Sequence, residues 1–499
     1  MGSSQQPQFD AAKALAKHEV RMDEIPQDVK SVNDVLSKLY PKRVISSSLE
    51  QQLWKQSYWS MHQREANPSL VFQPASAQEV AVALILCRAA QCKFSVKSGG
   101  HAAMRGASSA DGGVTIDLAN LNGVVLNENK SIASIGAGNR WEYVFKELDK
   151  YGVGVAGGRA GDVGAGGYTL GGGISFFASA QGWGCDNVRN YELVTADGEI
   201  LNVTYESYPD LFWALRGGGP NFGIVTRFDY ETFPQTDIFA GSMFYDYEHK
   251  DAVIKAFNTY SNHGDPKAAT WLSIVNSKGK KLMSALAMYA DPHPDAKVLQ
   301  PYLSIPSIGK TAKVRSMADM VHEIAEVNVK DHRQNYTNHT FKFDSNFVSW
   351  LADMFWEEME DNGESFETKQ GCILLLQFIT KEAVTLMQRN GGNCLSLKPE
   401  EAPYLNVLMP SAWCDEKDDE VVMSMVKKIF DLAITEGKRR ELYVDYIYMN
   451  YASAHQDVLK GYGEENYNQL KAIAEKYDPE GVFQKLRSGY FKFGGAPGL

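Results

Sequence analysis

The sequence predicts an α+β protein with two domains, and three observations lead to this prediction. Its 499 residues exceed the size of a typical single domain. Glycine is concentrated in the first half of the chain, where residues 152–173 hold 11 glycines in 22 positions against a background of about 7%. After Phe233 and Pro234 this character ends, and apolar strands alternate with helices, as in an antiparallel sheet flanked by helices. We therefore expect a first domain over residues 1–236, a second over 237–440 and a closing segment over 441–499.

The first domain should open with a short helix and a strand–helix–strand unit. Ser31 can cap the short helix. Further along, Leu70–Phe72 is expected as a strand, Ser76 as the N-cap of a helix over Val80–Ala90, and Phe94–Val96 as the next strand. This strand leads into residues 97–122, which therefore lie at the carboxyl end of a strand, where α/β folds commonly bind ligands.

Two glycine-rich segments point to a ligand held by backbone. In residues 97–106, KSGGHAAMRG, no side chain at Gly99 or Gly100 obstructs the approach of backbone N–H groups to an anionic ligand. The second segment, residues 152–173, contains a formal GxGxxG. This match follows an expected helix over residues 141–150, whereas the nicotinamide fingerprint follows a strand and opens a helix, so we reject nicotinamide binding. The sequence also has no P-loop, HExxH or Gly-x-Ser-x-Gly motif, which removes support for ATPase, zinc-protease and α/β-hydrolase classes.

The remaining elements follow from apolar runs bounded by turn residues. In the first domain we expect strands over residues 131–137, 188–195, 199–203 and 222–228, and a helix over 210–216. In the second domain we expect strands over 243–245, 271–275, 283–289, 373–378 and 404–409, and helices over 250–260, 347–360, 382–389 and 419–436. In the closing segment, tyrosines crowd a strand-like run over 443–451, before an amphipathic helix over 464–476.

Composition excludes several classes of partner. The net charge of −11 argues against nucleic acid, and the absence of an 18-residue apolar run argues against a membrane span. The N-terminus lacks the apolar core of a secretory signal, so we expect a cytoplasmic protein, or one whose leader was removed. Six scattered cysteines fit free thiols, and no metal site is expected. Four glycosylation sequons, at Asn129, Asn202, Asn335 and Asn338, stand against the expected cytoplasmic location.

Six motifs in the same order along the chain resemble the FAD-linked oxidoreductases of the berberine bridge enzyme-like group. They are KSGGHAAMRG with TIDLANLN, VGAGGYTLGGG, DNVRNYELVTADGEIL, DLFWALRGGGPNFGIVTRF and the closing YMNYA and YDPEGVFQ. The group shares the PCMH-type FAD-binding domain of vanillyl-alcohol oxidase. The resemblance implies that residues 1–236 bind FAD, that 237–440 bind substrate on an α+β domain, and that 441–499 return to the FAD domain. Residues 240–400 resemble the group in layout alone.

The resemblance implies a single covalent link to FAD, through His101. Many relatives carry a second link through a cysteine, but here that position is Ala160. A histidine that follows in the family motif is Tyr168 in this chain, so a phenol or backbone must replace the imidazole there. The residues that the resemblance assigns to FAD are Val96, Lys97, Ser98, Gly99, Gly100, His101, Gly106, Ala160, Gly161, Val163, Gly164, Gly167, Tyr168, Gly172, Gly173, Ile224 and Asn450.

The resemblance also implies a tyrosine base. Tyr451 follows the asparagine of the Tyr-x-Asn-Tyr motif, with Asn450 and Tyr448 as its positioning partners. Tyrosine has an ordinary pKa of about 10, so this role needs a nearby charge, a proton relay, or proton transfer concerted with hydride departure. Asn406 aligns with a catalytic glutamate of some relatives and could orient substrate, although residues 404–409 are equally well explained as a core strand.

The function expected from this resemblance is oxidation of a small organic molecule, of the kind found in fungal specialised metabolism. Hydride would pass to the flavin, and O2 would reoxidise it. An alternative from another class is a cyclase or isomerase that uses the flavin without net redox, and a third is a binding protein without turnover. The sequence leaves open which substrate is used, whether the enzyme is an oxidase or a dehydrogenase, and which oligomeric state it has.

Overall fold

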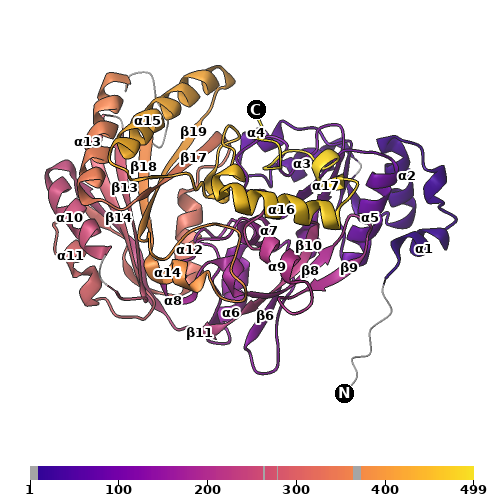
Figure 1. Cartoon of the computed structure of the whole chain (residues 1–499), viewed down its shortest axis with the longest axis horizontal. Coiled ribbons are helices and arrows are strands. Elements are labelled where there is room, and N and C mark those ends of the chain that lie inside the picture. The colour runs from indigo at the N-terminus through magenta and orange to yellow at the C-terminus, as the bar shows by residue number, and fades with distance from the viewer. Residues whose placement is uncertain (1–8, 46, 262–263, 278, 363–371, 499) are drawn as a thin grey trace.

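The chain forms a mixed helix and sheet structure in two parts, with residues 9–45, 47–261, 264–277, 279–362 and 372–498 described in a computed structural model (Figure 1). Over these ranges the strands form a four-stranded sheet, a five-stranded sheet, a two-stranded pair and a nine-stranded sheet. We refer to the first, second and fourth of these as the first, second and large sheets. The large sheet and its helices make up one part, and the other sheets the other part (Figure 1).

The first sheet carries the glycine turn at the carboxyl end of a parallel strand. Its order is β1-β2-β4-β3, and both β2 and β3 run parallel to β4. Its strands are β1 Val44–Ile45, β2 Leu70–Phe72, β3 Phe94–Lys97 and β4 Val114–Asp117, and the helices around it are α1 Ala11–Ala16, α2 Val29–Leu39, α3 Ser48–Lys55, α4 Met61–Arg64 and α5 Ala77–Ala89. As predicted, Ser76 caps α5, with its side chain accepting from the Glu79 N–H. The N-cap of α2 is Asp28 and not Ser31, because the Asp28 carboxylate already accepts from the Ser31 N–H.

The second sheet is antiparallel, with the order β5-β6-β10-β8-β9. Its strands are β5 Val124–Leu126, β6 Ile132–Gly136, β8 Val188–Val194, β9 Ile200–Val203 and β10 Ile224–Glu231, and β7 Val153–Gly154 pairs with β11 Phe233–Pro234. Helices α6 Trp141–Asp149, α8 Ala178–Gln181 and α9 Pro209–Leu215 connect them. The glycine run also contains a helix, α7 Ala165–Leu170, that the sequence analysis did not expect, because glycine is a poor helix former.

The large sheet has helices on its outer face and leaves its inner face toward the first part. Its order is β15-β12-β14-β13-β18-β19-β17-β20, with β16 beside β12, and its pairs are antiparallel. Helices α10, α11, α13 and α15 lie on the outer side in Figure 1. The strands are β12 Ile238–Asp246, β13 Ala268–Ser277, β14 Lys280–Tyr289, β15 Gly309–Lys310, β16 Lys313–Arg315, β17 Arg333–Lys342, β18 Cys372–Ile379, β19 Tyr404–Trp413 and β20 Tyr443–Val444. The helices of this part are α10 Lys250–Tyr260, α11 Gln300–Leu303, α12 Met317–Val327, α13 Ser345–Asn362, α14 Lys381–Leu386 and α15 Asp419–Arg439. The closing segment adds α16 Glu464–Tyr477 and α17 Val482–Lys485.

The predicted α+β class is confirmed, but two elements that shape the inner face, α12 and β17, were not predicted. Strand β17, RQNYTNHTFK, is rich in polar residues and carries two of the sequons, so it gave no apolar strand signal. Helix α12 packs against α6, and its Val321 carbonyl accepts from the Gly161 N–H. The tyrosine-rich run is a strand only at Tyr443–Val444, and residues 449–451 form a 3-10 turn instead.

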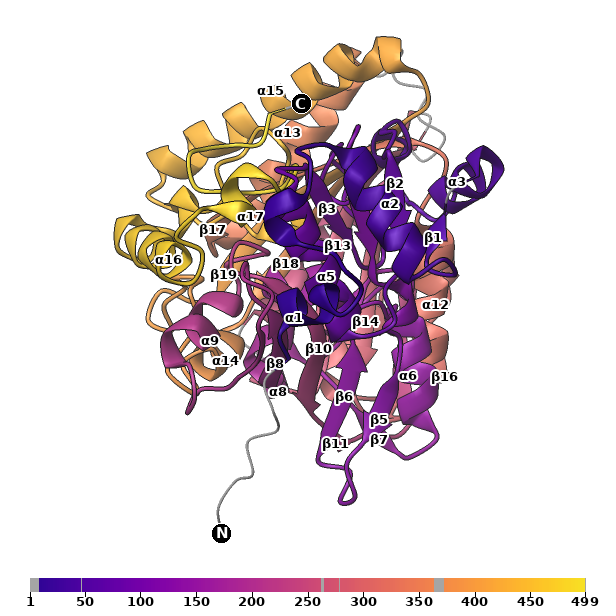
Figure 2. The ribbon, with the colours of Figure 1, turned by 90° about the vertical axis from the view of Figure 1, so that its right-hand side faces the viewer.

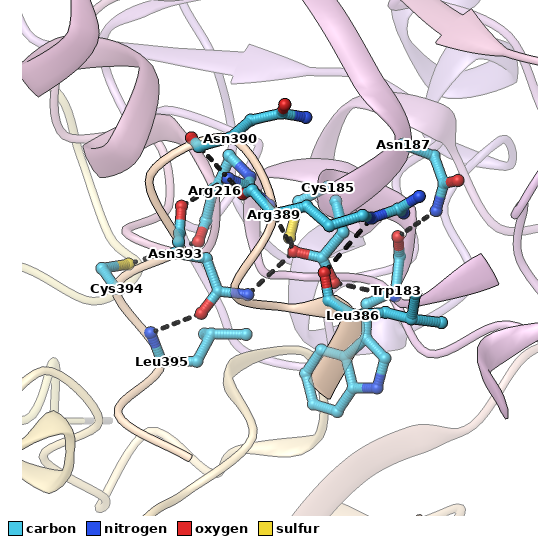
Figure 3. A network of polar contacts seen from close by, with 12 residues as sticks. Trp183, Cys185, Asn187, Arg216, Leu386, Arg389, Asn390, Asn393, Cys394 and Leu395 are labelled. Atoms are coloured by element: carbon cyan, nitrogen blue, oxygen red, sulfur yellow. Dashed lines mark hydrogen bonds and ion pairs between the residues drawn. The ribbon is translucent and has the colours of Figure 1, made fainter. Parts of the chain in front are cut away.

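A buried ion pair within the first part holds a loop of the other part. Arg216, which follows α9, donates to the Asp186 carboxylate at 2.8 Å, and both side chains are fully buried. The same guanidinium donates to the carbonyls of Arg389 and Gly392 in the loop after α14, and the Asn393 amide donates to Asp186 (Figure 3). Because a buried charge without its partner is costly, this loop is held firmly on the first part.

The closing segment returns to the first part. In Figure 2, α16 and α17 lie beside α9 and the first sheet, and Leu486 accepts from the Phe94 N–H while Ser488 donates to the Phe94 carbonyl. Residues 486–488 therefore cover the edge of β3. None of the described helices combines the length and the apolar character that crossing a membrane requires.

Candidate active site

A cavity of about 730 Å³ lies between the glycine-rich segments and the inner face of the large sheet. Its walls come from the turn after β3, the glycine run before and within α7, the 448–452 segment and residues 483–490. The volume is in the range of ligand pockets, which bury most of a bound molecule. Residues far apart in the sequence thus build one site.

The two glycine-rich segments meet at Gly99 and Gly164. A Cβ atom built on Gly99 would lie 2.5 Å from the Gly164 backbone, and one on Gly164 would meet the Gly99 backbone in turn. The Ser98 hydroxyl holds the segments in place, since it donates to the Ala137 carbonyl at 2.6 Å and accepts from the Gly166 N–H at 3.1 Å. Glycine is required at both positions because no side chain fits between the two backbones.

His101 faces the cavity in a fixed orientation. The Trp59 indole stacks on the imidazole with 4.3 Å between ring centroids and 8° between planes. Nε2 of His101 lies 3.3 Å from Oδ2 of Asp162, an ion-pair distance without the alignment of a hydrogen bond. The Asn328 amide donates to the other Asp162 oxygen at 3.1 Å. Burial acts to raise the pKa of the Asp162 carboxyl, but the contacts with His101 and Asn328 outweigh it and lower that pKa.

The two glycine-rich segments, residues 97–106 and 152–173, form a cradle. Two observations of the structure indicate that this cradle fits FAD. Gly99, Gly164 and Gly167 present main-chain surface to the cavity, and a Cβ atom built on Gly167 would meet no atom within 4 Å, so a ligand can approach the backbone there. A second wall carries Arg487, which is 3% exposed and has no hydrogen-bond partner for its Nε within the described residues. Burial lowers the pKa of this guanidinium to about 10. A buried cation that lines the cavity suits an anionic ligand such as a pyrophosphate.

Tyr451 stands at the junction of the cradle and the sheet, in contact with an arginine. One terminal nitrogen of Arg159 donates to the Tyr451 hydroxyl at 2.6 Å and to Oε1 of Gln377 at 2.8 Å. The guanidinium also lies over the Trp271 ring, 4.9 Å from its centroid. Arg159 and Tyr451 both line the cavity. The arrangement brings a positive charge to a phenol oxygen that a substrate can reach.

A buried polar row on the large sheet supports this pair. Gln377 on β18 lies opposite Asn406 on β19, which lies opposite Thr340 on β17. The Gln377 amide donates to Asn406, whose own amide donates to Asn338 at 2.8 Å. Asn338 in turn accepts from the Tyr448 N–H and donates to the Tyr448 carbonyl. The row thus connects Arg159 to the backbone that carries Tyr451.

Tyr448 is a buried acceptor and not an exposed acid or base. Its hydroxyl accepts from the Ile174 N–H and from the Asn450 amide, each at 3.0 Å. Burial raises its pKa, so the phenol stays protonated. Its ring packs edge-on against Tyr451 with 4.9 Å between centroids, which fits the predicted positioning role.

The inner face of the large sheet forms an apolar floor with hydroxyl groups. Side chains alternate along a strand, so that Trp271, Ser273 and Val275 of β13 face the cavity while Leu272 and Ile274 pack under α10 and α13. The neighbouring strands add further floor residues: Ser242, Ser284, Ile373, Leu375, Leu408, Pro410 and Ser411. This floor suits a neutral, largely apolar molecule with polar substituents.

Most predicted site residues line the cavity. Those that do are Val96, Ser98, Gly99, Gly100, His101, Ala160, Val163, Gly164, Gly167, Tyr168, Ile224, Tyr448, Asn450 and Tyr451. Those that the structure places outside its walls are Lys97, Gly106, Gly161, Gly172, Gly173 and Asn406.

Four of these positions lie away from the cavity for a clear physical reason. The Lys97 ammonium is buried 3.3 Å from Asp117, over the Trp54 and Tyr58 rings, so this side chain does not reach the cavity. Asn406 is fully buried with its amide in the polar row, so it cannot contact a substrate directly. Gly172, with Gly173, packs on aromatic rings beside α7.

The Tyr168 side chain lies in the core beside the cavity. Its hydroxyl donates to the Ala156 carbonyl at 3.2 Å, and the ring packs edge-on against Trp141. The hydroxyl is therefore bound within the core. Its carbonyl accepts from the Asn450 amide, so backbone and Asn450 form this part of the wall.

Four functional candidates escaped sequence reasoning. Arg159 and Asp162 are the two charged residues in the glycine run 152–173, and this contrast with their surroundings is the signal that could have found them. Gln377 lies in an apolar strand, LLLQFI, where a single polar residue on the inner face is again the exception. Arg487 follows the short, half-buried helix α17 and lies in no motif that could have marked it.

Comparison with known protein families identifies an FAD binding domain over residues 68–204. Two fungal relatives are similar along most of their length. The FAD-dependent monooxygenase tpcD of Cochliobolus heterostrophus is 34% identical over 452 residues, covering 87% of this chain and 86% of the relative. The FAD-dependent monooxygenase FUP4 of Fusarium proliferatum is 34% identical over 455 residues, covering 87% of each chain.

Solved structures share the fold at lower identity. Berberine bridge enzyme from Eschscholzia californica superposes with a TM-score of 0.76 at 17% identity, covering 95% of this chain and 99% of that one. 6-Hydroxy-D-nicotine oxidase from Arthrobacter nicotinovorans gives a TM-score of 0.73 at 21% identity, covering 89% and 96%. The PCMH-type architecture expected from the sequence motifs is confirmed.

Proposed function

The chain belongs to the berberine bridge enzyme-like family of FAD-linked oxidoreductases, and on this premise we propose that it oxidises a small organic molecule with Tyr451 as base. FAD, when bound in the cradle, supplies a two-electron acceptor for hydride. His101 would anchor it through one covalent bond, since the second attachment position is Ala160. The observation that carries the proposal is the contact between Arg159 and Tyr451 on the wall of the cavity.

Tyr451 takes the proton of a substrate hydroxyl in this proposal. The Arg159 guanidinium donates to the phenol oxygen, so it stabilises negative charge there before the proton arrives. Gln377 fixes the guanidinium through the same nitrogen. The place of Tyr451 on the cavity wall supports this role, because a general base must lie within hydrogen-bond reach of the proton that it takes.

The floor of the cavity orients the substrate. Trp271, Val275 and Leu375 give it an apolar surface, which excludes water from the reacting carbon. Serines on the same face, such as Ser273 and Ser284, offer hydroxyl groups to polar substituents. We propose a neutral specialised metabolite with an aromatic or alicyclic skeleton and at least one hydroxyl group.

The test is anaerobic incubation of the purified protein with metabolites extracted from the organism of origin. Bleaching of the yellow flavin absorbance identifies a substrate, and its return on admission of O2 identifies an oxidase. Tyr451→Phe should bleach far more slowly with the same metabolite. Product formation without any change in flavin absorbance would instead indicate the cyclase or isomerase alternative.

The names of the fungal relatives favour a different fate of O2, in which one of its atoms enters the product. Both are FAD-dependent monooxygenases, which place one atom of O2 in the product. Turnover under ¹⁸O2 separates the two: an oxidase leaves the product unlabelled and releases labelled hydrogen peroxide, whereas a monooxygenase yields labelled product. We propose the oxidase because the Arg159–Tyr451 pair supplies a base for a substrate hydroxyl.

A further inference from the structure

Asp162 is placed to act on His101, although no sequence motif assigns it a role. The carboxylate lies 3.3 Å from Nε2 of the imidazole, and the side chains are 9% and 13% exposed. Within the described residues, neither Nε2 nor the facing Asp162 oxygen has a hydrogen-bond partner elsewhere. Each is therefore the other's available partner in a buried setting.

The surroundings of the pair fix which ring nitrogen is free. Asn328, directly after α12, holds the second Asp162 oxygen at 3.1 Å, so that the carboxylate cannot turn away without losing this bond. The Trp59 indole covers one face of the imidazole. Nε2 is buried against Asp162, and His101 still lines the cavity. The nitrogen left for a bond to a ligand is Nδ1.

We propose that Asp162 is the positioning residue for covalent attachment of FAD, holding Nε2–H so that the Nδ1 lone pair faces the 8α carbon. This inference rests on the His101 link of the proposed function. A carboxylate on one imidazole nitrogen fixes the tautomer and makes the other nitrogen more basic, as it does for histidines that bind metals. Asp162 adds a second effect, because the ring becomes cationic once Nδ1 is substituted and a carboxylate stabilises that charge.

The attachment balances with O2 as the oxidant. A bond forms between Nδ1 and the 8α carbon, and one C–H bond of that methyl group breaks. Its electron pair reduces the flavin ring. O2 then accepts these two electrons together with the methyl proton and the imidazole proton, and leaves as hydrogen peroxide.

The experiment compares wild-type protein with Asp162→Asn, Asn328→Ala and His101→Ala. Flavin fluorescence of the denatured protein on a gel measures the covalent fraction, and flavin absorbance of the folded protein measures total binding. Loss of the carboxylate partner of a metal-bound imidazole typically costs about 10- to 100-fold, and we expect a comparable drop in the attachment rate of Asp162→Asn when FAD is added. Total binding should persist. Asn328→Ala keeps the carboxylate and should slow attachment less.

Two results would overturn the proposal. One is attachment in Asp162→Asn at the wild-type rate. The other is found without any variant: nuclear magnetic resonance of the flavin peptide from wild-type protein should show substitution at Nδ1, and substitution at Nε2 would contradict the geometry. This second measurement holds even if Asp162→Asn fails to fold. A fluorescent band from denatured His101→Ala would instead refute the His101 link itself, which keeps the two failures distinct.

Discussion

Removal of the Arg159 charge and of the Tyr451 hydroxyl, alone and together, tests the proposed base. The two groups touch at 2.6 Å, so their effects should not add. General base catalysis contributes about 10²- to 10⁴-fold, which sets the loss expected for Tyr451→Phe. A hydrogen bond to a charged group contributes about 1.5–3 kcal/mol, and at about 1.36 kcal/mol per factor of ten Arg159→Met should cost about 13- to 160-fold.

The double variant should react no more slowly than Tyr451→Phe alone, because Arg159 acts through the phenol that is already gone. The assay is stopped-flow measurement of flavin reduction under anaerobic conditions, with the metabolite that bleaches the wild-type flavin. Tyr143→Phe and Arg105→Met change exposed residues and should match the wild-type rate. If the two losses multiply in the double variant, Arg159 acts on the substrate independently and the reasoning fails.

Three further variants test the glycine cradle, the buried Arg216–Asp186 ion pair and a buried histidine. Gly164→Ala should abolish FAD binding, since its methyl group would meet the Gly99 backbone; flavin absorbance of the purified protein measures this. Arg216→Met should lower the free energy of unfolding by about 3–5 kcal/mol in urea, because it leaves Asp186 buried without its partner. Burial lowers the pKa of His339 to about 4, below the value of about 6.5 in the unfolded chain. The unfolded state therefore binds more protons, and stability should fall by about 3 kcal/mol as the pH drops from 6.5 to 4; His339→Gln should remove this part of the slope in urea unfolding.

Each of these variants has a matched control or a contrary outcome. Gly123→Ala places a methyl group in open space and should keep its flavin. Lys427→Met breaks an exposed ion pair and should change stability by less than about 1 kcal/mol; a similar loss in both variants would contradict the special role of Arg216. An unchanged pH slope in His339→Gln would show that other groups control acid stability.

Sequence reasoning found the parts of the site that depend on backbone and on local motifs. Glycines at positions 99 and 164 follow from the need for close backbone approach, and His101 and Tyr451 follow from motifs of a known family. All four lie on the cavity wall. Local patterns suffice to find these residues because each lies in a short motif, although their positions in the site depend on contacts with distant segments.

The parts that depend on distant pairing could not be read from the sequence. Asn406 was expected to orient substrate or to be plain core, yet its role follows from strand register, which places it between Gln377 and Thr340. Lys97 belongs to a ligand-binding motif, but a carboxylate 20 residues away on the neighbouring strand holds its ammonium. Single-strand patterns carry no information on which residues oppose one another.

The position of β17 within the large sheet also determines which sequons are accessible. Asn335 and Asn338 lie on β17, with 8% and 0% of their surface exposed, and the Asn338 amide is bound to the Tyr448 carbonyl. A glycan on either would have to be accommodated inside the sheet. In the folded protein, the accessible sequons are therefore Asn129 and Asn202, which lie at the surface.

The order of the cavity walls along the chain has a consequence for biosynthesis. Walls formed by residues 96–108 and 158–174 are made early, whereas Tyr451, Arg487 and Tyr490 are made last. The cavity is therefore complete only when residues 448–490 have been made and have packed against the earlier segments. A chain truncated before residue 448 would keep both glycine-rich walls but lack the wall that carries Tyr451, Arg487 and Tyr490.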